Sequence, residues 1–432
     1  MRSIPIGARL FAAALAVYCV CPPFTGYDSY YVVPTALSLI HHGTTAVDEF
    51  VPNAPEVSRY AAEKAGGHWR NAYPLAVPVL AAPLIAAVDL GTAAIAKVFP
   101  GAAARAPHPI IAAFLSHDLI GGRPLVELFC GAFIGATTVW VAWRICLLLL
   151  PARQAVWLTL LFAFGTTQWS IASRNLMQHG LSILLLTVAI YLAILARQRP
   201  SLIAWVAVPV ALSFTVRPSN CIAVVVFSLY VAIHYRRELP RYLAFAAPVV
   251  VLFFGYNLLV LGRVPPHYFV TSPSRYPPLL GLAMNLVSPA RGLLVYMPIV
   301  LFAVAGMWTA WRTRWLFPLS AYLAAIPIAH MFFIAPYWAG HCFGPRYFCD
   351  MTPFFLLFLI PAILWWTKAP PGGTRQAAAA VFVVLALWGV FVNLRGATSI
   401  AVNQWSAVPV SVDEAQWRVW DWNDPPFLRG LR

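Results

Sequence analysis

The chain has 432 residues, of which 61% are hydrophobic and only 10% are charged, and its mean hydropathy is +0.75. A soluble protein of this length needs far more polar surface, so the composition excludes an ordinary soluble protein. The formal net charge is +15, but the Lys and Arg residues stand singly or in pairs at the ends of apolar stretches. That placement is typical of membrane topology signals. An all-α polytopic membrane protein is therefore predicted, without a nucleic-acid partner.

A basic N-terminus leads into the first apolar stretch, about 8–22, and no clear small-x-small cleavage site follows it. We interpret this stretch as a retained signal-anchor helix with a cytoplasmic N-terminus. Alternating ten further stretches across the membrane places the short basic turns inside, which predicts about eleven crossings. The ten stretches are 124–148, 155–171, 179–196, 201–215, 218–234, 241–261, 293–310, 316–335, 351–367 and 376–393.

One more stretch, 73–99, is apolar enough to span, but counting it would move Arg144 and Arg153 to the outside. It also contains three prolines and Asp89. We therefore expect it to form helices that lie in or dip into the outer interface, with a twelfth crossing as the alternative.

The predicted outer side carries the long polar segments of the chain. They are the first outer loop at about 23–123, the loops 262–292 and 336–350, and the tail 394–432. We expect a membrane domain, 1–393, and a short tail that folds onto the outer loops. The four Trp residues of the tail are assigned to the membrane interface rather than to sugar stacking. Cys342 and Cys349 share one outer loop, where a disulfide is permitted but their spacing does not determine one.

Arginine is frequent in the predicted outer segments, against the usual bias of positive charge. An excess there suggests an anionic partner such as a phosphate, with anionic lipid headgroups as the alternative. Arg291, in NLVSPARGLLVYMPIVL (285–301), and Arg346, in YWAGHCFGPRYFCDMTPFF (337–355), each stand just before an apolar stretch. A guanidinium held there can grip two phosphate oxygens. Arg174 and Arg217 are further phosphate-binding candidates.

Four strings resemble the GT-C superfamily of polytopic glycosyltransferases, especially bacterial relatives of protein O-mannosyltransferases and of the lipid A aminoarabinose transferase. SPARGLLVYMP and WAGHCFGPRYF resemble strings of that family. GYDSYYVVPTALSLI resembles its first outer loop, and AVWLTLLFAFGTTQWSIASRNLMQHGLSILLL (155–186) its second. The likeness covers most of residues 1–393, and the order of the motifs is more specific than any one of them.

The resemblance implies a GT-C fold in the inner membrane, with interfacial helices in the first outer loop. It implies that a monosaccharide passes from a polyprenyl-phosphate donor to a hydroxyl of a glycan, lipid or protein, with inversion, at the extracytoplasmic face. The family's general base is a carboxylate of the first outer loop, a role that falls on Asp28. Such a base contributes about 10²–10⁴ in rate, and fixed Arg side chains can stabilise the leaving phosphate. Neither a metal nor another cofactor is indicated.

The acidic candidates have structural alternatives. Asp28 is a favoured N-cap residue for the helix expected to begin near Ser29. Asp48 and Glu49 lie in the same outer loop and are interpreted as solvated or structural, although a second acid or an acceptor-orienting role is the alternative. Tyr27 is a possible substrate contact.

The second outer loop departs from the family pattern. Where some members carry an acid, this chain has Arg174, Gln178 and His179, which puts carboxylate-based metal binding in doubt. His179 and His341 are possible contacts to substrate, with satisfied interface or loop histidines as the alternative. No His, Cys or acidic cluster has metal-ligand spacing.

Two other classes of function remain open. A transporter or flippase of lipid-linked sugars could use the same outer arginines, but it should show charged or broken positions near mid-membrane and an internal repeat. No clear repeat is visible in the sequence. A structural partner in a larger envelope complex is the third possibility. Asp28→Asn separates the first two, because a flippase has no proton to abstract.

Overall fold

The computed structural model describes residues 5–24, 26–264, 268, 276–368 and 372–431. Helices make up nearly all of the regular structure in these residues, which confirms the predicted all-α class. The longer helices are α1 (Ile6–Cys19), α2 (Val32–His42), α3 (Ala76–Val98), α5 (Arg123–Leu149), α6 (Ala152–Phe164), α7 (Gln178–Ala196), α8 (Ala207–Val216), α9 (Cys221–His234), α10 (Leu239–Leu259), α12 (Pro278–Val287), α14 (Val300–Thr313), α15 (Leu319–Ile334), α16 (Thr352–Lys368) and α17 (Gly373–Thr398).

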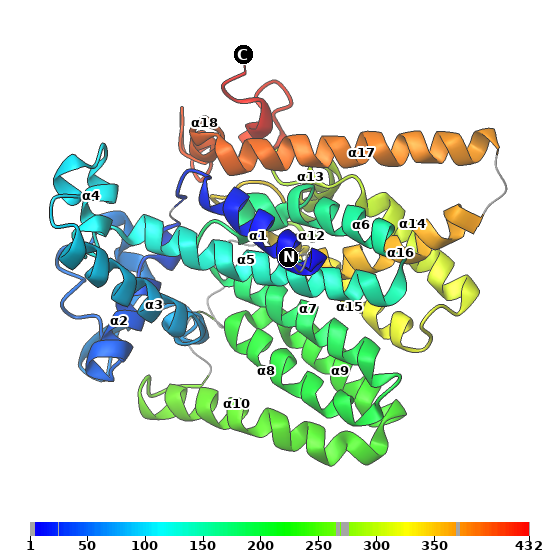
Figure 1. Cartoon of the computed structure of the whole chain (residues 1–432), viewed down its shortest axis with the longest axis horizontal. Helices are drawn as coiled ribbons and strands as arrows, with labels where there is room; N and C mark the ends of the chain where they lie inside the picture. The colour runs from blue at the N-terminus through cyan, green and yellow to red at the C-terminus, as the bar shows by residue number, and fades with distance from the viewer. Residues whose placement is uncertain (1–4, 25, 265–267, 269–275, 369–371, 432) are drawn as a thin grey trace.

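Short helices join these elements. Those that matter for the site are the 3₁₀ helices η1 (Tyr27–Ser29), η2 (Glu56–Ala61), η6 (Pro218–Asn220) and η8 (Arg346–Met351). The others are α4 (Pro109–Leu115), α13 (Leu293–Tyr296), α18 (Ile400–Asn403), η3 (Ala103–Arg105), η4 (Gln168–Ala172), η5 (Pro200–Val206), η7 (Arg236–Glu238), η9 (Gln404–Ser406), η10 (Gln416–Trp420) and η11 (Pro426–Leu428). Figure 1 shows α5, α10 and α17 running lengthwise, with α2, α3 and α4 gathered in a lobe at one end.

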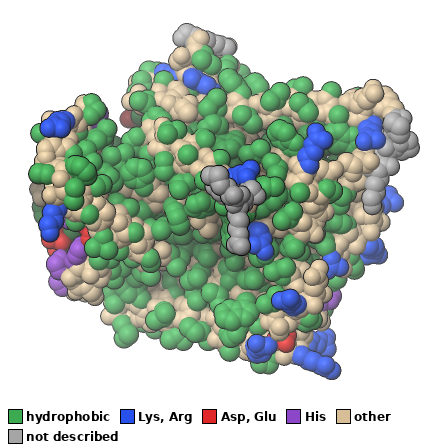
Figure 2. Space-filling model, viewed as in Figure 1, with side chains coloured by type: hydrophobic (Ala, Val, Ile, Leu, Met, Phe, Trp, Pro, Cys, Tyr) green, Lys and Arg blue, Asp and Glu red, His purple; other side chains and the backbone are tan. Residues whose placement is uncertain are grey.

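The surface of the helical bundle is apolar. Within the described residues, six helices are long and apolar enough to cross a membrane: α3, α5, α7, α10 with η7, α16 with η8, and α17. Only 11% of the apolar window of α10 is buried inside the molecule, and only 17% of that of α17. Figure 2 shows hydrophobic side chains over most of the visible face. Such a surface is unfavourable in water, and the chain is a membrane protein.

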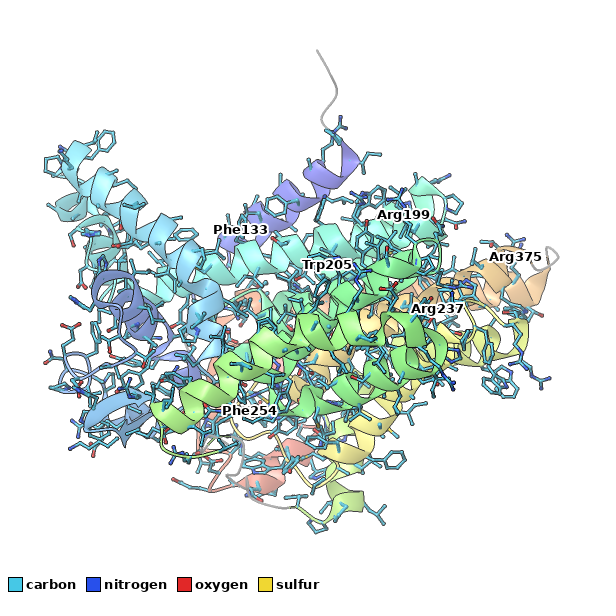
Figure 3. All side chains as sticks on the ribbon, turned by 90° about the horizontal axis from the view of Figure 1, so that it is seen from below. Phe133, Arg199, Trp205, Arg237, Phe254 and Arg375 are labelled. Carbon is cyan, nitrogen blue, oxygen red and sulfur yellow. The ribbon has the colours of Figure 1, made fainter. Side chains whose placement is uncertain are left out.

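Each of the eleven apolar stretches predicted to cross the membrane contains a helix. Five of them belong to the six membrane-length helices, and the other six form helical segments of 17 residues or fewer. The number of crossings therefore stays a prediction. Figure 3 shows Arg199, Arg237 and Arg375, from three of the predicted inside turns, at the same end of the molecule.

The stretch 73–99 differs from the sequence expectation. It forms one continuous helix, α3, of 23 residues rather than several interfacial pieces. Pro78 lies in its first turn, where a backbone N–H has no helical partner anyway, so only Pro83 removes an interior hydrogen bond. Asp89 is buried against His41 and His117, which form ion pairs with its two oxygens at 2.9 and 3.6 Å.

A two-stranded antiparallel hairpin interrupts the helical pattern of the first outer loop. Strands β1 (Ala62–Ala65) and β2 (His68–Asn71) pair so that Ala62 lies opposite Asn71. The two residues between them, Gly66 and Gly67, have φ of +59° and +83°, as a tight two-residue hairpin turn requires. The sequence analysis did not predict this hairpin, because its strands lack the residues that favour β-structure.

The C-terminal tail folds against the rest of the molecule, as expected. Trp405 is buried with Trp338 and Val412 in a small apolar cluster of its own. Arg395 donates to the carbonyl oxygens of Phe427 and Arg429, which fixes the end of the tail to α17. The permitted disulfide between Cys342 and Cys349 is not formed, because both thiols are free.

Candidate functional site

Asp28 lies in η1, just after the first apolar helix, and its two carboxylate oxygens have different partners. Oδ2 accepts a hydrogen bond from Arg346 Nη2 at 2.9 Å, which is also an ion pair. Oδ1 accepts hydrogen bonds from the hydroxyls of Tyr60 and Tyr73 at 2.6 and 2.7 Å. The N-cap residue of the following helix, α2, is Tyr31, without a side-chain cap. Asp28 is therefore part of a side-chain cluster rather than a helix cap.

The hairpin explains how two tyrosines reach one carboxylate. Tyr60 lies two residues before Ala62, and Tyr73 lies two residues after Asn71, its partner across the hairpin. Closing the hairpin therefore places the two tyrosines on either side of one position, with ring centroids 6.5 Å apart. The hairpin is held to the preceding loop by the bond from Val47 N to Trp69 O, at 2.8 Å.

The charge state of Asp28 follows from this environment. Burial disfavours the carboxylate and by itself raises its pKa, but Arg346 and the hydrogen bonds from Tyr60 and Tyr73 outweigh burial. The pKa of Asp28 is consequently lowered below its ordinary value. Burial, followed by the negative charge of Asp28, raises the pKa of both tyrosines. At neutral pH Asp28 is ionised, and the tyrosines remain neutral donors.

Arg346 is presented by a loop whose backbone only glycine suits at one position. Gly344 has φ of +62°, and a Cβ added there would lie 2.7 Å from the ring of Tyr296. The chain then enters η8, whose first residue is Arg346. The side chain of Arg346 is 19% exposed, and its Nε is buried without a hydrogen-bond partner in the described structure. The guanidinium therefore has donor capacity beyond its contact with Asp28.

A small polar hollow adjoins the pair. It has a volume of about 10 Å³ and is lined by Asp28, Tyr73, Met177 and Gln178, among others. Gln178 Oε1 accepts a hydrogen bond from the hydroxyl of Tyr268 at 2.9 Å, and the rings of Tyr268 and Tyr73 lie 4.9 Å apart. In this structure the hollow has room for about one water molecule.

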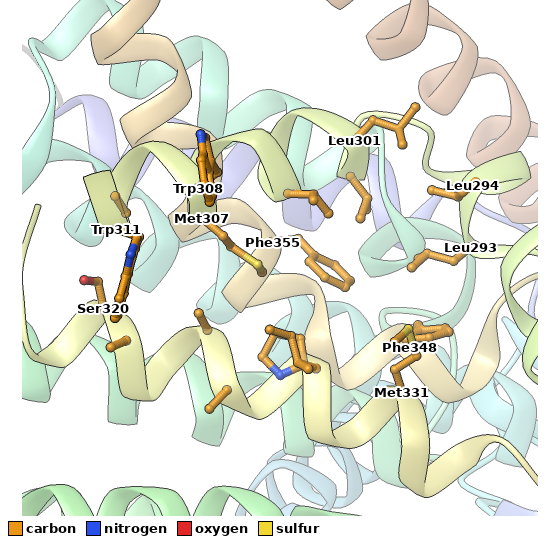
Figure 4. A pocket seen from close by; sticks show the side chains of 18 of the residues that line it. Leu293, Leu294, Leu301, Met307, Trp308, Trp311, Ser320, Met331, Phe348 and Phe355 are labelled. Carbon is orange, nitrogen blue, oxygen red and sulfur yellow. The ribbon is translucent and has the colours of Figure 1, made fainter. Parts of the chain in front are cut away.

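A large apolar cavity lies on the other side of η8. Its volume is about 770 Å³, and it runs between α14 and α15 (Figure 4). Leu293 and Phe348 line one end, whereas Trp311 and Ser320 line the other. Because α14 has 14 residues, the cavity extends for roughly 20 Å along it. Phe348 follows Arg346 by two residues, so the same short helix borders both the polar pair and the apolar cavity.

Sequence analysis missed Asp350, which forms a buried charge cluster behind η8. Asp350 is fully buried, and its Oδ2 forms an ion pair with Arg217 at 2.6 Å. His179 Nδ1 lies 3.6 Å from Oδ1. Arg217 begins η6, at the end of α8, and His179 is the second residue of α7. The cluster therefore fixes η8, and with it Arg346, to two helices of the membrane domain.

Sequence analysis also missed Glu127, which holds η1 from the other side. Glu127 is fully buried in α5 and pairs with Arg123 one turn earlier. Its Oε2 accepts a hydrogen bond from Ser29 Oγ at 2.6 Å, next to Asp28, and a longer one from Leu176 N. An acid inside an apolar stretch was the signal that could have identified both Glu127 and Asp350.

Two predicted phosphate-binding arginines are engaged elsewhere. Arg291 is fully buried and donates to the carbonyl of Gly340 and to Ser406 Oγ, so it joins an outer loop to the tail. Arg174 is also buried and donates to the carbonyls of Pro22 and Gly396. Backbone carbonyls occupy the donors that a phosphate would need, whereas Arg346 and Arg217 both pair with carboxylates.

The remaining candidates lie around the cluster rather than in it. Asp48 accepts from Trp69 N and lies 2.8 Å from His68 Nδ1, so it stabilises the hairpin. Glu49 and Tyr27 are exposed. His341 lies 3.0 Å from Ser411 Oγ and 3.2 Å from Asp413, both in the tail. Among the residues that the structure describes, no group of three or more His, Cys or acidic residues could hold a metal ion.

A scan against models of known protein families finds no match to the chain, and a search of curated proteins finds none either.

Proposed function

We propose that this chain is an inverting glycosyltransferase of GT-C type in the inner membrane. It transfers a monosaccharide from a polyprenyl-phosphate donor to the hydroxyl of a glycan, lipid or protein acceptor at the extracytoplasmic face. The observation that carries the proposal is the position of η8, with Arg346 paired to Asp28 and Phe348 in the wall of the apolar cavity. A short helix with a cation on one side and a 20 Å apolar channel on the other suits a ligand with one charged end and a long hydrocarbon chain.

The ion pair suggests how the donor activates the base. In the free protein Arg346 lowers the pKa of Asp28, which makes the carboxylate a weak base. When a donor phosphate binds Arg346, the phosphate shares the positive charge, and the pKa of Asp28 rises toward its ordinary value. Donor binding thus provides both a neutralised leaving group and a stronger base.

The chemical step then balances without a metal. The acceptor O–H bond breaks and its proton passes to Asp28, while the acceptor oxygen forms a bond to the anomeric carbon of the sugar. The bond from that carbon to the phosphate oxygen breaks on the opposite face, and its electron pair leaves with the phosphate. Arg346 stabilises the negative charge that grows on the leaving group, and Tyr60 and Tyr73 hold the carboxylate in place.

The other arginines take supporting roles in this proposal. Arg217 is the second phosphate candidate, because its Nε is buried without a partner in the described structure and it shares the cluster of Asp350 with η8. Arg174 and Arg291 hold the loops and the tail through backbone carbonyls. His179 orients the buried cluster and does not itself touch the reacting atoms.

A binding experiment tests the amphipathic site. Affinity for a fluorescent polyprenyl phosphate is measured for the purified full chain, for Arg346→Gln, and for Arg263→Gln, a control that breaks another arginine–carboxylate pair of the outer side. A hydrogen bond to a charged group contributes about 1.5–3 kcal/mol. We therefore expect Arg346→Gln to weaken binding at least tenfold and Arg263→Gln to leave it unchanged. Equal affinity of wild type and Arg346→Gln would contradict the proposal, as would equal affinity for the uncharged polyprenol.

A further inference from the structure

A second apolar groove lies between α14, α16 and α17, on the other side of α14. Its volume is about 370 Å³. Phe302 and Ala362 line it, together with two tryptophans, Trp308 and Trp365, whose side chains are 60% and 63% exposed. Figure 1 shows α17 alongside α14 and α16 at this end of the molecule. Trp308 also borders the larger cavity, but the donor site as proposed uses neither α17 nor this groove.

One cation stands at the mouth of the groove. Among the residues that line it, Arg312 is the charged one, and no acid is present. Arg312 is exposed, and its guanidinium lies 4.6 Å from the ring centroid of Trp308. It takes part in none of the ion pairs formed by the described residues. Its charge is therefore free for an anion that approaches along the apolar wall.

We propose that this groove binds one anionic phospholipid of the surrounding bilayer. The phosphate lies on Arg312 beside Trp308, and an acyl chain follows the apolar wall formed by Phe302, Trp365 and Ala362. An acyl chain carries no hydrogen-bonding groups, so it suits a wall of this kind, whereas a peptide would need partners for its backbone. Basic pockets between membrane helices bind anionic headgroups for the same reason. The inference requires a membrane location but not the sugar-transfer activity.

Native mass spectrometry of the delipidated full chain tests this site. Retention of added phosphatidylglycerol is compared with that of phosphatidylcholine carrying the same acyl chains. Arg312→Gln removes the cation. Arg153→Gln removes an exposed cation at the start of α6, outside the groove, and serves as the matched control. Ala378→Phe fills the groove from α17 while keeping Arg312.

The expected result is a tightly retained phosphatidylglycerol in the wild type and in Arg153→Gln. A basic residue near a membrane surface contributes about 1 kcal/mol to binding an anionic lipid, so Arg312→Gln should lower retention about fivefold. Ala378→Phe should lower it as well. Equal retention of phosphatidylcholine, or unchanged retention in Arg312→Gln, would show ordinary annular lipid and overturn the proposal. A lipid-free dimer that Ala378→Phe disrupts would also overturn it, because a second copy would then fill the groove.

Discussion

Asp28 is held by three side chains that the sequence separates widely. Arg346 comes from the loop before α16, whereas Tyr60 and Tyr73 flank the hairpin of the first outer loop. Ser29, the next residue, is held in turn by Glu127 of α5. The carboxylate therefore has a fixed position and a fixed charge before any ligand arrives. Preorganisation of this kind is what a general base needs.

The lowered pKa of Asp28 predicts a specific dependence of stability on pH. Because the pKa is lower in the folded than in the unfolded chain, ionised Asp28 stabilises the fold above its unfolded pKa of about 3.9. That contribution is lost as the pH falls through the folded-state pKa. We expect the thermal unfolding midpoint of the wild type to exceed that of Asp28→Asn at pH 6, and the difference to shrink below about pH 4. A difference that stays constant from pH 3 to pH 7 would contradict the assignment.

The buried pair of Asp350 and Arg217 predicts strong coupling between two positions. Asp350→Asn leaves the Arg217 charge buried without its counter-ion, which costs about 3–5 kcal/mol. Replacing both residues, as Asp350→Leu with Arg217→Met, removes both charges and should restore much of the loss. The thermal midpoint in detergent measures both variants. If the double variant is no more stable than Asp350→Asn, the two residues do not act as a pair.

At the scale of elements, α14 and α16 approach each other closely at Gly306. A Cβ built at Gly306 would lie 1.7 Å from the carbonyl oxygen of Phe358. The two helices border the apolar cavity and the groove, so their separation controls the width of both. This contact cannot be read from the sequence, since nothing local distinguishes Gly306 from other glycines in apolar helices.

A pair of glycine substitutions tests this contact. Gly306→Ala forces α14 and α16 apart and should cost about 1–3 kcal/mol or more through overpacking. Gly255→Ala, in α10, adds a methyl group where no atom lies within 4 Å, and alanine favours a helix by about 1 kcal/mol over glycine. Thermal unfolding should therefore show a lower midpoint for Gly306→Ala and an unchanged or higher one for Gly255→Ala. Equal midpoints would exclude close packing at Gly306.

The predictability of the elements depended on the length of their signal. Long apolar stretches were placed within a few residues, because each contains a sustained hydrophobic pattern. The continuous helix α3 was misjudged, because prolines in a first turn do not break a helix. The hairpin was missed, and with it the reason that Tyr60 and Tyr73 meet at Asp28. Gly66–Gly67 was the local sign of the turn, but the strands around it carry little β preference.

At the scale of the whole molecule, the tail and the outer loops are joined by buried arginines. Arg291 connects the loop of Gly340 with Ser406, and Arg418 donates to the carbonyls of Trp405 and Val408. The sequence identified Arg291 as a basic residue before an apolar stretch, but its partners are distant in the chain. Asp350 and Glu127 were missed for a related reason, because burial and pairing across the fold determine their roles.

Exchanging the two arginines experimentally separates a structural role from a ligand-binding one. Arg291→Met should loosen the tail, so limited proteolysis should cut residues 404–432 several times faster, because its hydrogen bonds to Gly340 and Ser406 are lost. Polyprenyl-phosphate binding should be retained. Arg346→Met should show the opposite pattern, with normal proteolysis and weakened binding. Loss of binding in Arg291→Met with an intact tail would return Arg291 to the phosphate site.

The most direct test of the central claim is sugar transfer itself. The purified full chain is incubated with a panel of polyprenyl-phosphate sugars and candidate acceptors, and release of the polyprenyl phosphate is measured for the wild type, Asp28→Asn and Asp48→Asn. We predict turnover with at least one donor, a loss of at least about 10²-fold in Asp28→Asn with donor binding retained, and near-normal turnover in the Asp48→Asn control. Full turnover by Asp28→Asn would contradict the account. So would movement of the donor across the membrane by wild type and Asp28→Asn alike without sugar transfer, as expected of a flippase.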